Sequence, residues 1–360
     1  MLSYHAEGFT AQDCPSLVGV PRIKDRCADF VVEEIPAYEP SGAGEHLFVW
    51  LQKEGMAAEV LMRHVARTLQ IDTSEIGCAG LKDTRAITRQ YISVPAAAMP
   101  HLAALDNEHV TVLGHALHGN KLKTGHLKGN RFSIRIPDQS QDNAARAAVI
   151  AEHLTKHGFA NFYGPQRFGG GDTLELGLAL LAVGPKNHLP NRKVSRMLRR
   201  LALSSVQSAL FNQVLSKRLA RNVLHTVLTG DVCLVRASGG PFVSDDAARE
   251  TQRLKEQEIV TAGPMFGPKM RAAQGEALAL ELETLQSAGL GREMFRGYGK
   301  LLQGTRRANI VWPQGLALTY DAAETLTLTF ELPPGSYATV LLREFWRQAP
   351  QDVGLKSQSA

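Results

Sequence analysis

Residues 80–94 read GLKDTRAITRQYISV, and this stretch joins a polar loop to a strand pattern. Tyr91, Ile92 and Val94, led in by residues 88–90, predict a strand. A short apolar run at residues 76–80 precedes the loop. The sequence therefore predicts two strands whose tight connection, residues 81–86, carries the carboxylate of Asp83.

Further strand patterns lie on both sides of this stretch, bounded by turns rich in proline and glycine. They are residues 28–35, 45–52, 131–136 and 326–332. The stretch RFSIRI at 131–136 alternates apolar with polar side chains, which predicts a half-buried strand with a basic outer face. After the last strand, a Pro-Pro-Gly turn leads into a predicted final helix at about 337–348.

Helical periodicity dominates the middle of the chain. At 56–70, the side chains expected on one buried face are Val60, Leu61, Val65, Thr68 and Leu69. Residues 186–225 predict one or two helices with a buried apolar stripe that includes Leu201. Ser244 is a predicted N-cap, and residues 263–268 are a predicted loop. Strand-rich ends around a helix-rich middle predict one α+β domain interrupted by an inserted domain.

The composition is that of an ordinary globular protein. The 360 residues are 44% apolar and 21% charged, with 4 cysteines, which excludes a disordered chain, a collagen-like repeat and a disulfide scaffold. A single core rarely grows beyond about 250–300 residues, so the length predicts two domains.

The positive charge is concentrated in two segments without acidic residues, 109–137 and 186–225. Together they contain 14 of the 40 Lys and Arg residues, whereas the rest of the chain has 26 basic residues against 35 acidic ones. A single basic run is usually a solvated face. Two long runs favour an extended polyanion such as nucleic acid, because each neutralised phosphate releases counterions.

The sequence predicts neither a cofactor nor a metal. No two cysteines form a Cys-x-x-Cys pair, there is no phosphate-binding Gly-x-x-x-x-Gly-Lys motif, and His115 and His118 lack a third ligand. Residues 1–14 have no apolar segment like that of a signal peptide, and the apolar run 176–184 is too short to span a bilayer. We therefore expect a cytoplasmic protein with reduced thiols and no membrane contact.

The residues around Asp83 allow two interpretations. Lys82, Arg85 and Arg89 are cations that would keep the carboxylate ionised, and a fixed carboxylate can act as a nucleophile or as an electrostatic stabiliser. By spacing alone, however, a Lys-Asp pair in a loop is more often an ordinary turn.

Six segments, in the same order, resemble motifs of the TruD family of tRNA pseudouridine synthases. The loop Gly80–Gln90 resembles the catalytic motif, and Lys128-Gly129-Asn130-x-Phe132 resembles a strand motif of the family. Residues 161–169, NFYGPQRFG, resemble its hallmark motif with a Phe and a Tyr exchanged. The other three are Lys24 with Asp29–Glu34, Gly42 with Gly44–His46, and Pro334–Thr339 with Arg343 and Glu344.

The resemblance implies a chemistry and a set of site residues. The family isomerises uridine to pseudouridine in tRNA, typically at position 13, without a cofactor or metal. Asp83 would be the nucleophile, and attack on the sugar C1′ or on the base C6 both remain open. A uridine must leave its stack to be reached, and flat rings can receive it. The implied substrate-binding residues are Phe30, Asn130, Phe132, Tyr337, Lys24, Lys82 and Gln90.

Other roles are open for several of these residues. An aromatic residue in a strand is often a core residue, which for Phe132 alone would be the stronger interpretation. Asn130 could read the uracil edge or hold the catalytic loop. Most lysines lie at the surface, so Lys24 could be an exposed residue without a role in the site. Lys82 could point away from Asp83, because the side chains of neighbouring residues often do.

The resemblance also implies the domain organisation: a pseudouridine-synthase-type catalytic domain with a mixed β-sheet and flanking helices, residues 1–157 plus 306–360, interrupted by a helix-rich α/β insertion, residues 158–305. The tRNA would bind in a cleft between the two. Nothing requires an oligomer, so we expect a monomer. The predicted phosphate contacts, which position RNA without selecting the uridine, are Lys128, Arg131, Arg135, Arg196, Arg199 and Arg200.

Two other functions fit parts of the sequence. A non-catalytic RNA-binding module would use the basic segments equally well but would not need a carboxylate among cations. A hydrolase acting through Asp83 on a nucleoside would leave both basic segments without a purpose.

Overall fold

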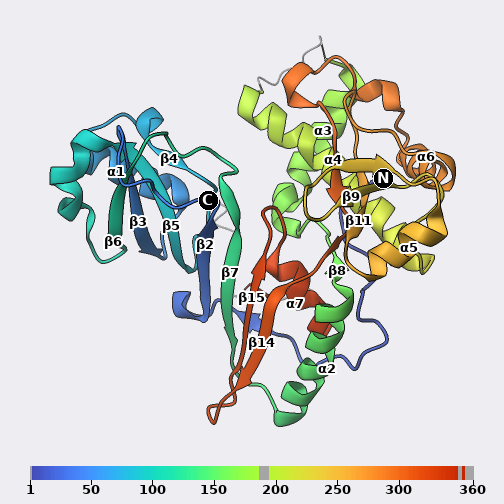
Figure 1. Ribbon diagram of the computed structural model, residues 1–360, viewed down its shortest axis with the longest axis horizontal. Coiled ribbons are helices and arrows are strands. Elements are labelled where there is room, and N and C mark those ends of the chain that lie inside the picture. Colours follow the sequence, from blue (N-terminus) through green and yellow to red (C-terminus); the bar gives the residue numbers. More distant parts are fainter. Residues whose placement is uncertain (1, 186–193, 348–350, 353–360) are drawn as a thin grey trace. The chain divides into compact units, whose positions relative to one another are not determined.

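The computed structural model describes residues 2–185, 194–347 and 351–352 (Figure 1). These residues form two compact units. The sheet unit comprises Cys14–Thr155, Pro313–Ala338 and Phe345–Ala360. The helical unit comprises Met1–Asp13, Lys156–Trp312 and Thr339–Glu344. Each unit therefore combines segments that lie far apart in the sequence.

An eight-stranded mixed sheet is the centre of the sheet unit. Its order is β14-β15-β7-β2-β5-β3-β6, with β4 pairing to β5. Strands β2 and β5 run parallel, and the other pairs in this sheet are antiparallel. The strands are β2 (Phe30–Pro36), β3 (His46–Glu54), β4 (Gly77–Cys78), β5 (Ile87–Pro95), β6 (Val110–His118), β7 (Leu127–Ile136), β14 (Gln314–Tyr320) and β15 (Leu326–Leu332). The sheet confirms the predicted mixed α+β fold.

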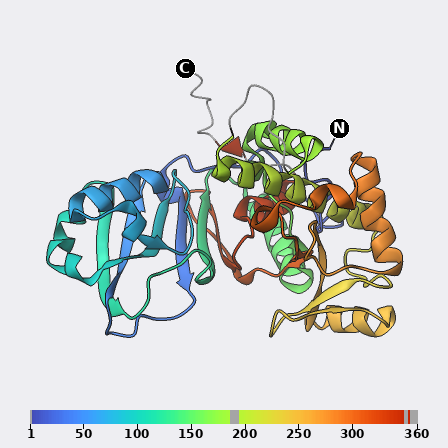
Figure 2. The same ribbon diagram turned by 90° about the horizontal axis from the view of Figure 1, so that it is seen from above.

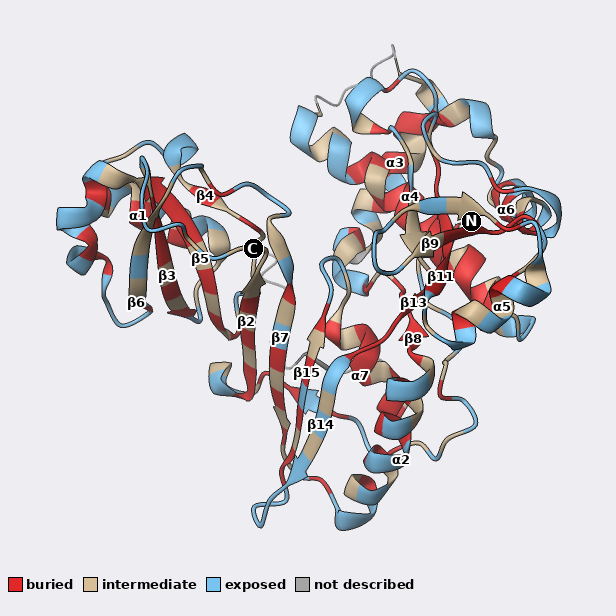
Figure 3. Ribbon diagram, in the orientation of Figure 1, coloured by how far each residue is buried: buried red, intermediate tan, exposed pale blue. Residues whose placement is uncertain are grey.

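Strand β15, from late in the sequence, lies inside this sheet between β14 and β7. It pairs with β7 from Leu326 opposite Ile136 to Leu332 opposite Asn130. On its other side, β7 pairs with β2, where Glu34 lies opposite Asn130. The outer strand β14 is largely exposed, whereas β2, β3 and β5 are mostly buried along one face (Figure 3).

Helix α1 (Ala58–Leu69) covers one face of this sheet together with the 3-10 segment η3 (Ala96–Leu105) (Figure 2). Leu61, Val65 and Leu69 pack against apolar side chains of β3 and β5, as the periodicity predicts. The prediction is wrong for Val60, which is exposed because it lies outside this contact stripe. The remaining elements of the unit are β1 (Arg22–Ile23), η1 (Cys27–Asp29), η2 (Thr73–Glu75), α2 (Gln141–His157, whose last two residues belong to the helical unit) and β16 (Gln351–Asp352).

The helical unit is built on α3 (Asp172–Val183) and α4 (Arg196–Ala220). These two helices share an apolar core with Phe168, Phe266 and Phe295. The predicted stripe of α4 is wrong at Leu201, which is exposed near the start of the helix. The other elements are β8 (Phe159–Ala160), η4 (Pro165–Gly171), β9 (Val232–Val235), β10 (Pro241–Val243), α5 (Ala247–Lys255), β11 (Ile259–Met265), α6 (Gly275–Ser287), η5 (Arg292–Phe295), η6 (Gly299–Leu301), β12 (Thr305–Ala308) and β13 (Ile310–Val311).

Two local predictions in the helical unit are corrected. The N-cap of α5 is Asp246, whose side chain accepts a hydrogen bond from the Arg249 backbone N–H, and not Ser244. The predicted loop at 263–268 overlaps the end of β11, so residues 263–265 belong to a strand. Gly263 is needed in this strand because a Cβ atom at that position would come within 2.8 Å of the Phe211 ring. A glycine in a strand often marks such a close approach.

The last helix, α7 (Ala338–Trp346), begins one residue after its predicted start. Among the described residues, no helix combines the length and the apolar character needed to cross a bilayer.

Candidate active site

The carboxylate of Asp83 is held on the loop between β4 and β5. The Asp83 side chain is 45% exposed, and its Oδ1 lies 3.0 Å from Nζ of Lys24. The carboxylate is therefore fixed by a partner and still accessible from solvent. This combination suits a nucleophile better than a structural turn residue.

Lys24 is unusual for a lysine in its burial and in its backbone conformation. Its side chain is only 7% exposed, and its ammonium group lies 4.2 Å from the centre of the Phe30 ring as well as bonding Asp83. Its backbone φ of 62° lies in the left-handed region, which costs a non-glycine residue roughly 1–2 kcal/mol. Strain of this kind persists where the surrounding structure imposes it, often at functional sites.

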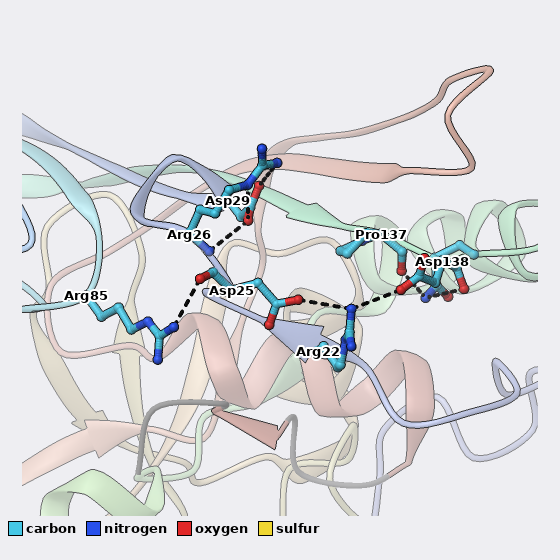
Figure 4. A network of polar contacts seen from close by, with 8 residues as sticks. Arg22, Asp25, Arg26, Asp29, Arg85, Pro137 and Asp138 are labelled. Atoms are coloured by element: carbon cyan, nitrogen blue, oxygen red, sulfur yellow. Dashed lines mark hydrogen bonds and ion pairs between the residues drawn. The ribbon is translucent and has the colours of Figure 1, made fainter. Parts of the chain in front are cut away.

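The segment that presents Lys24 is connected to the Asp83 loop by polar contacts (Figure 4). Arg85, two residues after Asp83, donates a hydrogen bond of 3.0 Å to the backbone carbonyl of Asp25. Arg26 is paired with the buried carboxylate of Asp29 at 3.0 Å, and Arg22 is paired with Asp25 at 3.2 Å. These contacts stabilise the two loops in the geometry that brings Lys24 to Asp83.

Lys82 lies beside Asp83 in the sequence, but its side chain is used elsewhere. Its ammonium group pairs with Glu34 of β2 at 2.8 Å, and both side chains are buried. Glu34 also accepts a hydrogen bond from the Tyr91 backbone N–H at 3.4 Å. The Lys82–Glu34 pair therefore anchors the Asp83 loop to the sheet, and a contact between Lys82 and substrate stays a prediction.

A second lysine, which the sequence patterns did not single out, also contacts Asp83. Lys53, near the end of β3, is fully buried and donates a hydrogen bond of 2.6 Å to the backbone carbonyl of Asp83. It donates a second bond of 2.8 Å to the carbonyl of Met56. Burial lowers the Lys53 pKa to about 8, and the nearby Asp83 carboxylate only partly opposes this effect. The strand pattern contained the signal, because Lys53 follows Leu47, Val49 and Leu51 in the buried phase of β3.

Several of the predicted substrate-binding residues share one face of the sheet. Residues directly opposite each other on paired strands share a face, and the register pairs Asn130 with Glu34 and Phe132 with Val32. The Phe132 ring packs between Phe30, at 6.2 Å between centroids, and Phe330, at 5.2 Å. The structure therefore brings Phe30, Asn130 and Phe132 together, and it buries both rings.

Two buried amide oxygens on these strands have no hydrogen-bond partner among the described residues. They are Oε1 of Gln90 on β5 and Oδ1 of Asn130 on β7. A buried acceptor without a donor is unfavourable, so each oxygen is suited to accept a bond from a ligand or a water molecule. Tyr337 is half-buried at the N-cap of α7.

The predicted phosphate contacts occupy two elements. Lys128, Arg131 and Arg135 lie on β7, where Lys128 and Arg131 are exposed and Arg135 is half-buried. Arg196, Arg199 and Arg200 lie in the first turns of α4, in the other unit. Lys186, Arg192 and Lys193, from the second basic segment, lie outside the described residues.

The expected basic outer face of β7 is partly neutralised. Arg131 pairs with Glu33 of β2 at 3.1 Å and with Glu331 of β15 at 2.8 Å. These carboxylates raise the Arg131 pKa above its usual value, with Glu331 the larger cause. The predicted basic outer face of β7 therefore includes Arg131, but its charge is offset there by acids from neighbouring strands that are distant in sequence.

The motif at residues 161–169 has a structural role inside the helical unit. Asn161 donates a hydrogen bond of 2.9 Å to the Ala308 carbonyl and accepts one of 2.7 Å from Arg307. Asn212 of α4 bonds both the backbone N–H and the carbonyl of Tyr163, and the Phe168 side chain is fully buried. The motif thus joins β8, α4 and β12.

Comparison with known proteins gives one consistent result. The family model described as tRNA pseudouridine synthase D (TruD) matches residues 11–191 and 188–345. The tRNA pseudouridine synthase D of Thermus thermophilus is 42% identical over 338 residues, covering 93% of this chain and 91% of the relative. That of Anaeromyxobacter sp. Fw109-5 is 41% identical over 321 residues, covering 89% and 90%.

The fold has a counterpart among solved structures. A crystal structure from Methanosarcina mazei, assigned as a putative tRNA pseudouridine synthase D, superposes with a TM-score of 0.73 at 24% identity and covers 96% of this chain and 97% of its own. The family model covers most of the chain, and the relatives share about two residues in five over nearly its full length. The chain therefore belongs to the TruD family of tRNA pseudouridine synthases.

Proposed function

We propose that this protein isomerises uridine to pseudouridine in tRNA, at uridine 13, with Asp83 as the nucleophile. The observation that carries the proposal is the half-exposed Asp83 carboxylate held 3.0 Å from the buried ammonium group of Lys24. The ion pair fixes the direction of the carboxylate, and a fixed, accessible carboxylate can act as a nucleophile. Membership of the TruD family supplies the reaction and the class of substrate.

The reaction requires one bond to break and another to form. The bond between uracil N1 and ribose C1′ breaks, the base rotates, and a bond between C5 and C1′ forms. C5 loses its proton and the freed N1 gains one, so the product is an isomer of the substrate. Asp83 either takes C1′ as a covalent partner during the rotation or adds to C6 of the base. Both routes return the carboxylate at the end, so neither consumes a cofactor.

The sheet face beside Asp83 supports a place for the extruded base. The buried rings of Phe30 and Phe132 would form an apolar wall for the base. The Oδ1 of Asn130, which has no hydrogen-bond partner among the described residues, is an acceptor for the uracil N3–H. The Oε1 of Gln90 is a second acceptor on the neighbouring part of the sheet. Tyr337 completes the proposed set through its position at the start of α7.

The proposed domain division follows the family. Residues 1–157 with 306–360 form the catalytic domain, and residues 158–305 form the insertion. The compactness of the helical unit supports a separate insertion, and that unit also includes residues 1–13, 156–157, 306–312 and 339–344 of the proposed catalytic domain. Lys128, Arg135 and the α4 residues Arg196, Arg199 and Arg200 are the proposed phosphate contacts, which position the tRNA.

The test uses tRNA labelled with tritium at uridine C5, because formation of the new C–C bond releases that hydrogen. Asp83→Asn is expected to abolish release and to leave the dissociation constant for tRNA nearly unchanged. Asp142→Asn, which changes an exposed aspartate on α2, is the matched control and should react like the wild type. A tRNA with cytidine at position 13 should release no tritium from that site.

Three outcomes would contradict parts of the proposal. Normal release by Asp83→Asn would exclude Asp83 as the nucleophile. Tight tRNA binding by the wild type without release from any tRNA pool would indicate a non-catalytic RNA-binding module. Release from a position other than 13 would contradict the proposed target position in tRNA, but it would still support the proposed isomerisation.

A further inference from the structure

Among the described residues, no carboxylate forms an ion pair or a hydrogen bond with the buried ammonium group of Lys53. The hydrogen bonds of its ammonium group go to two neutral backbone carbonyls, those of Asp83 and Met56. A fully buried ammonium group without a hydrogen-bonded carboxylate is costly, and an apolar residue of similar size is the more stable solution in most cores. The position therefore contains a charge that stability alone does not explain.

The register of the sheet shows how Lys53 reaches the catalytic loop. Lys53 lies opposite Thr88 on β5, and Thr88 lies opposite Val32 on β2, which in turn lies opposite Phe132 on β7. All four side chains therefore emerge on the same face of the sheet. Lys53 thus extends from the face that carries the proposed base-binding rings.

Asp83 is held at two different atoms by two lysines from separate elements. Lys24 bonds the carboxylate at 3.0 Å, and Lys53 bonds the backbone carbonyl at 2.6 Å. The carbonyl bond fixes the peptide plane of Asp83, and this plane sets the direction of the side chain. The Met56 carbonyl, just before α1, ties the same ammonium group to a rigid part of the unit.

We propose that Lys53 is a positioning residue for the isomerisation, in which its ammonium group fixes the Asp83 backbone so that the carboxylate is aimed at the target nucleotide before the tRNA binds. This inference rests on the proposed function. It requires no contact between Lys53 and the substrate. A preorganised nucleophile of this kind acts on the chemical step and leaves the affinity for tRNA largely intact.

The charged groups that face Lys53 define how it responds to pH. They are the Asp83 carboxylate, Lys82 and the thiol of Cys27. With a pKa of about 8, the ammonium group loses its proton in mildly alkaline solution. The neutral amine donates weaker hydrogen bonds and no longer attracts the carboxylate, so the single-turnover rate should fall as the pH rises through about 8.

The experiment compares Lys53→Met, which removes the charge, with Lys53→Arg, which keeps it at every pH used. The readouts are the single-turnover rate of tritium release, the dissociation constant for tRNA, and backbone hydrogen exchange of residues 80–86. Lys255→Met, at an exposed lysine in the last turn of α5, is the matched control. Circular dichroism establishes that each variant is folded.

Lys53→Met is expected to lower the single-turnover rate about 100-fold, as misplacement by about 1 Å can do, and to change tRNA affinity by less than about threefold. Its catalytic loop should exchange faster than that of the control. Lys53→Arg should retain more activity than Lys53→Met and should lose the decline near pH 8, because the guanidinium stays protonated.

Two results would overturn the role of Lys53. One is a folded Lys53→Met protein with wild-type rate and loop protection. The other is a Lys53→Arg protein whose alkaline decline matches that of the wild type, and this outcome is decisive even if Lys53→Met does not fold. A wild-type protein that releases no tritium would instead overturn the proposed function, and the role of Lys53 in that reaction with it.

Discussion

Lys24 and Asp83 form an ion pair in which the cation is buried and the anion is half-exposed. The ammonium group also lies over the Phe30 ring, so its position is fixed from two sides. The exposed member, Asp83, is the proposed nucleophile, and the buried member, Lys24, holds its carboxylate in place. Because Lys24 adopts a left-handed backbone conformation, the geometry depends on the loop as well as on the side chain.

Replacing Lys24 by Met is therefore expected to lower the rate of tritium release by about 10²-fold, similar to the loss of one preorganised donor. The Asp83 carboxylate would lose its partner while the loop keeps its backbone path. Lys24→Gly removes the charge and also relieves the backbone strain. It should be as inactive as Lys24→Met but more stable in urea unfolding. Wild-type activity in either variant would show that the pair is not used in catalysis.

Glu34→Gln is predicted to destabilise the protein strongly, because it leaves the buried ammonium group of Lys82 without a counter-charge. Breaking a buried pair from one side typically costs about 3–5 kcal/mol. The double variant Glu34→Gln with Lys82→Met should recover part of this loss. Guanidinium unfolding of the two single variants and the double variant measures the coupling. A loss of less than about 1 kcal/mol in Glu34→Gln would be inconsistent with the pair as an anchor of the loop.

A comparison of Phe132 with Phe330 tests whether Phe132 lines the substrate pocket or is only a core residue. Their rings stack at 5.2 Å, and both are buried. Substitution of either by Ala should cost about 3–5 kcal/mol of stability. Only Phe132→Ala should also lower the single-turnover rate at temperatures where both variants remain folded, because its ring lies beside Phe30. Equal rates in the two variants would identify Phe132 as a core residue only.

The salt dependence of tRNA binding should distinguish the basic residues of β7. Lys128 is exposed and has no acidic partner among the described ion pairs, whereas Arg131 is already paired with Glu33 and Glu331. Lys128→Ala should reduce the slope of log affinity against log salt by about 0.7–0.9, the value for one phosphate contact. Arg131→Ala should change the slope less. Fluorescence anisotropy with labelled tRNA at several salt concentrations measures both, and the reverse order would contradict this account.

Lys53 should make stability and activity change in opposite directions with pH. Its pKa is about 8 in the folded protein, against 10.5 for an ordinary lysine, so between these limits the unfolded chain binds more protons. The free energy of unfolding contributed by this group therefore rises with pH in that window. Activity should fall in the same window. Unfolding measured at about pH 7, 8 and 9.5 in wild type and Lys53→Met checks the sign, since the variant should lack this rise.

Strand patterns and motif residues could be predicted from the sequence. Contacts between residues on paired strands could not, because they depend on the register of the sheet. Asp83 and Lys24 could be named because both belong to short motifs, and the strand at 326–332 was predicted at its observed bounds. The partners of Arg131 could not be predicted, because Glu331 is 200 residues away and only strand pairing brings it close. The sequence predicts a loop at Gly263, whereas this residue lies in a strand. The glycine is needed there because of the neighbouring Phe211 ring, and that tertiary contact cannot be read from the sequence.

The place of β15 in the sheet has a consequence for synthesis of the protein. Strand β7 ends at Ile136, but the strand that covers its free edge begins only at Leu326. A ribosome adding about 5–20 residues per second needs on the order of ten to forty seconds to produce the intervening chain. During that time the nascent sheet exposes an open edge, which is a template for pairing with other chains. Messages truncated within the intervening segment should therefore yield aggregating products, even though they encode Lys24, Lys53 and Asp83.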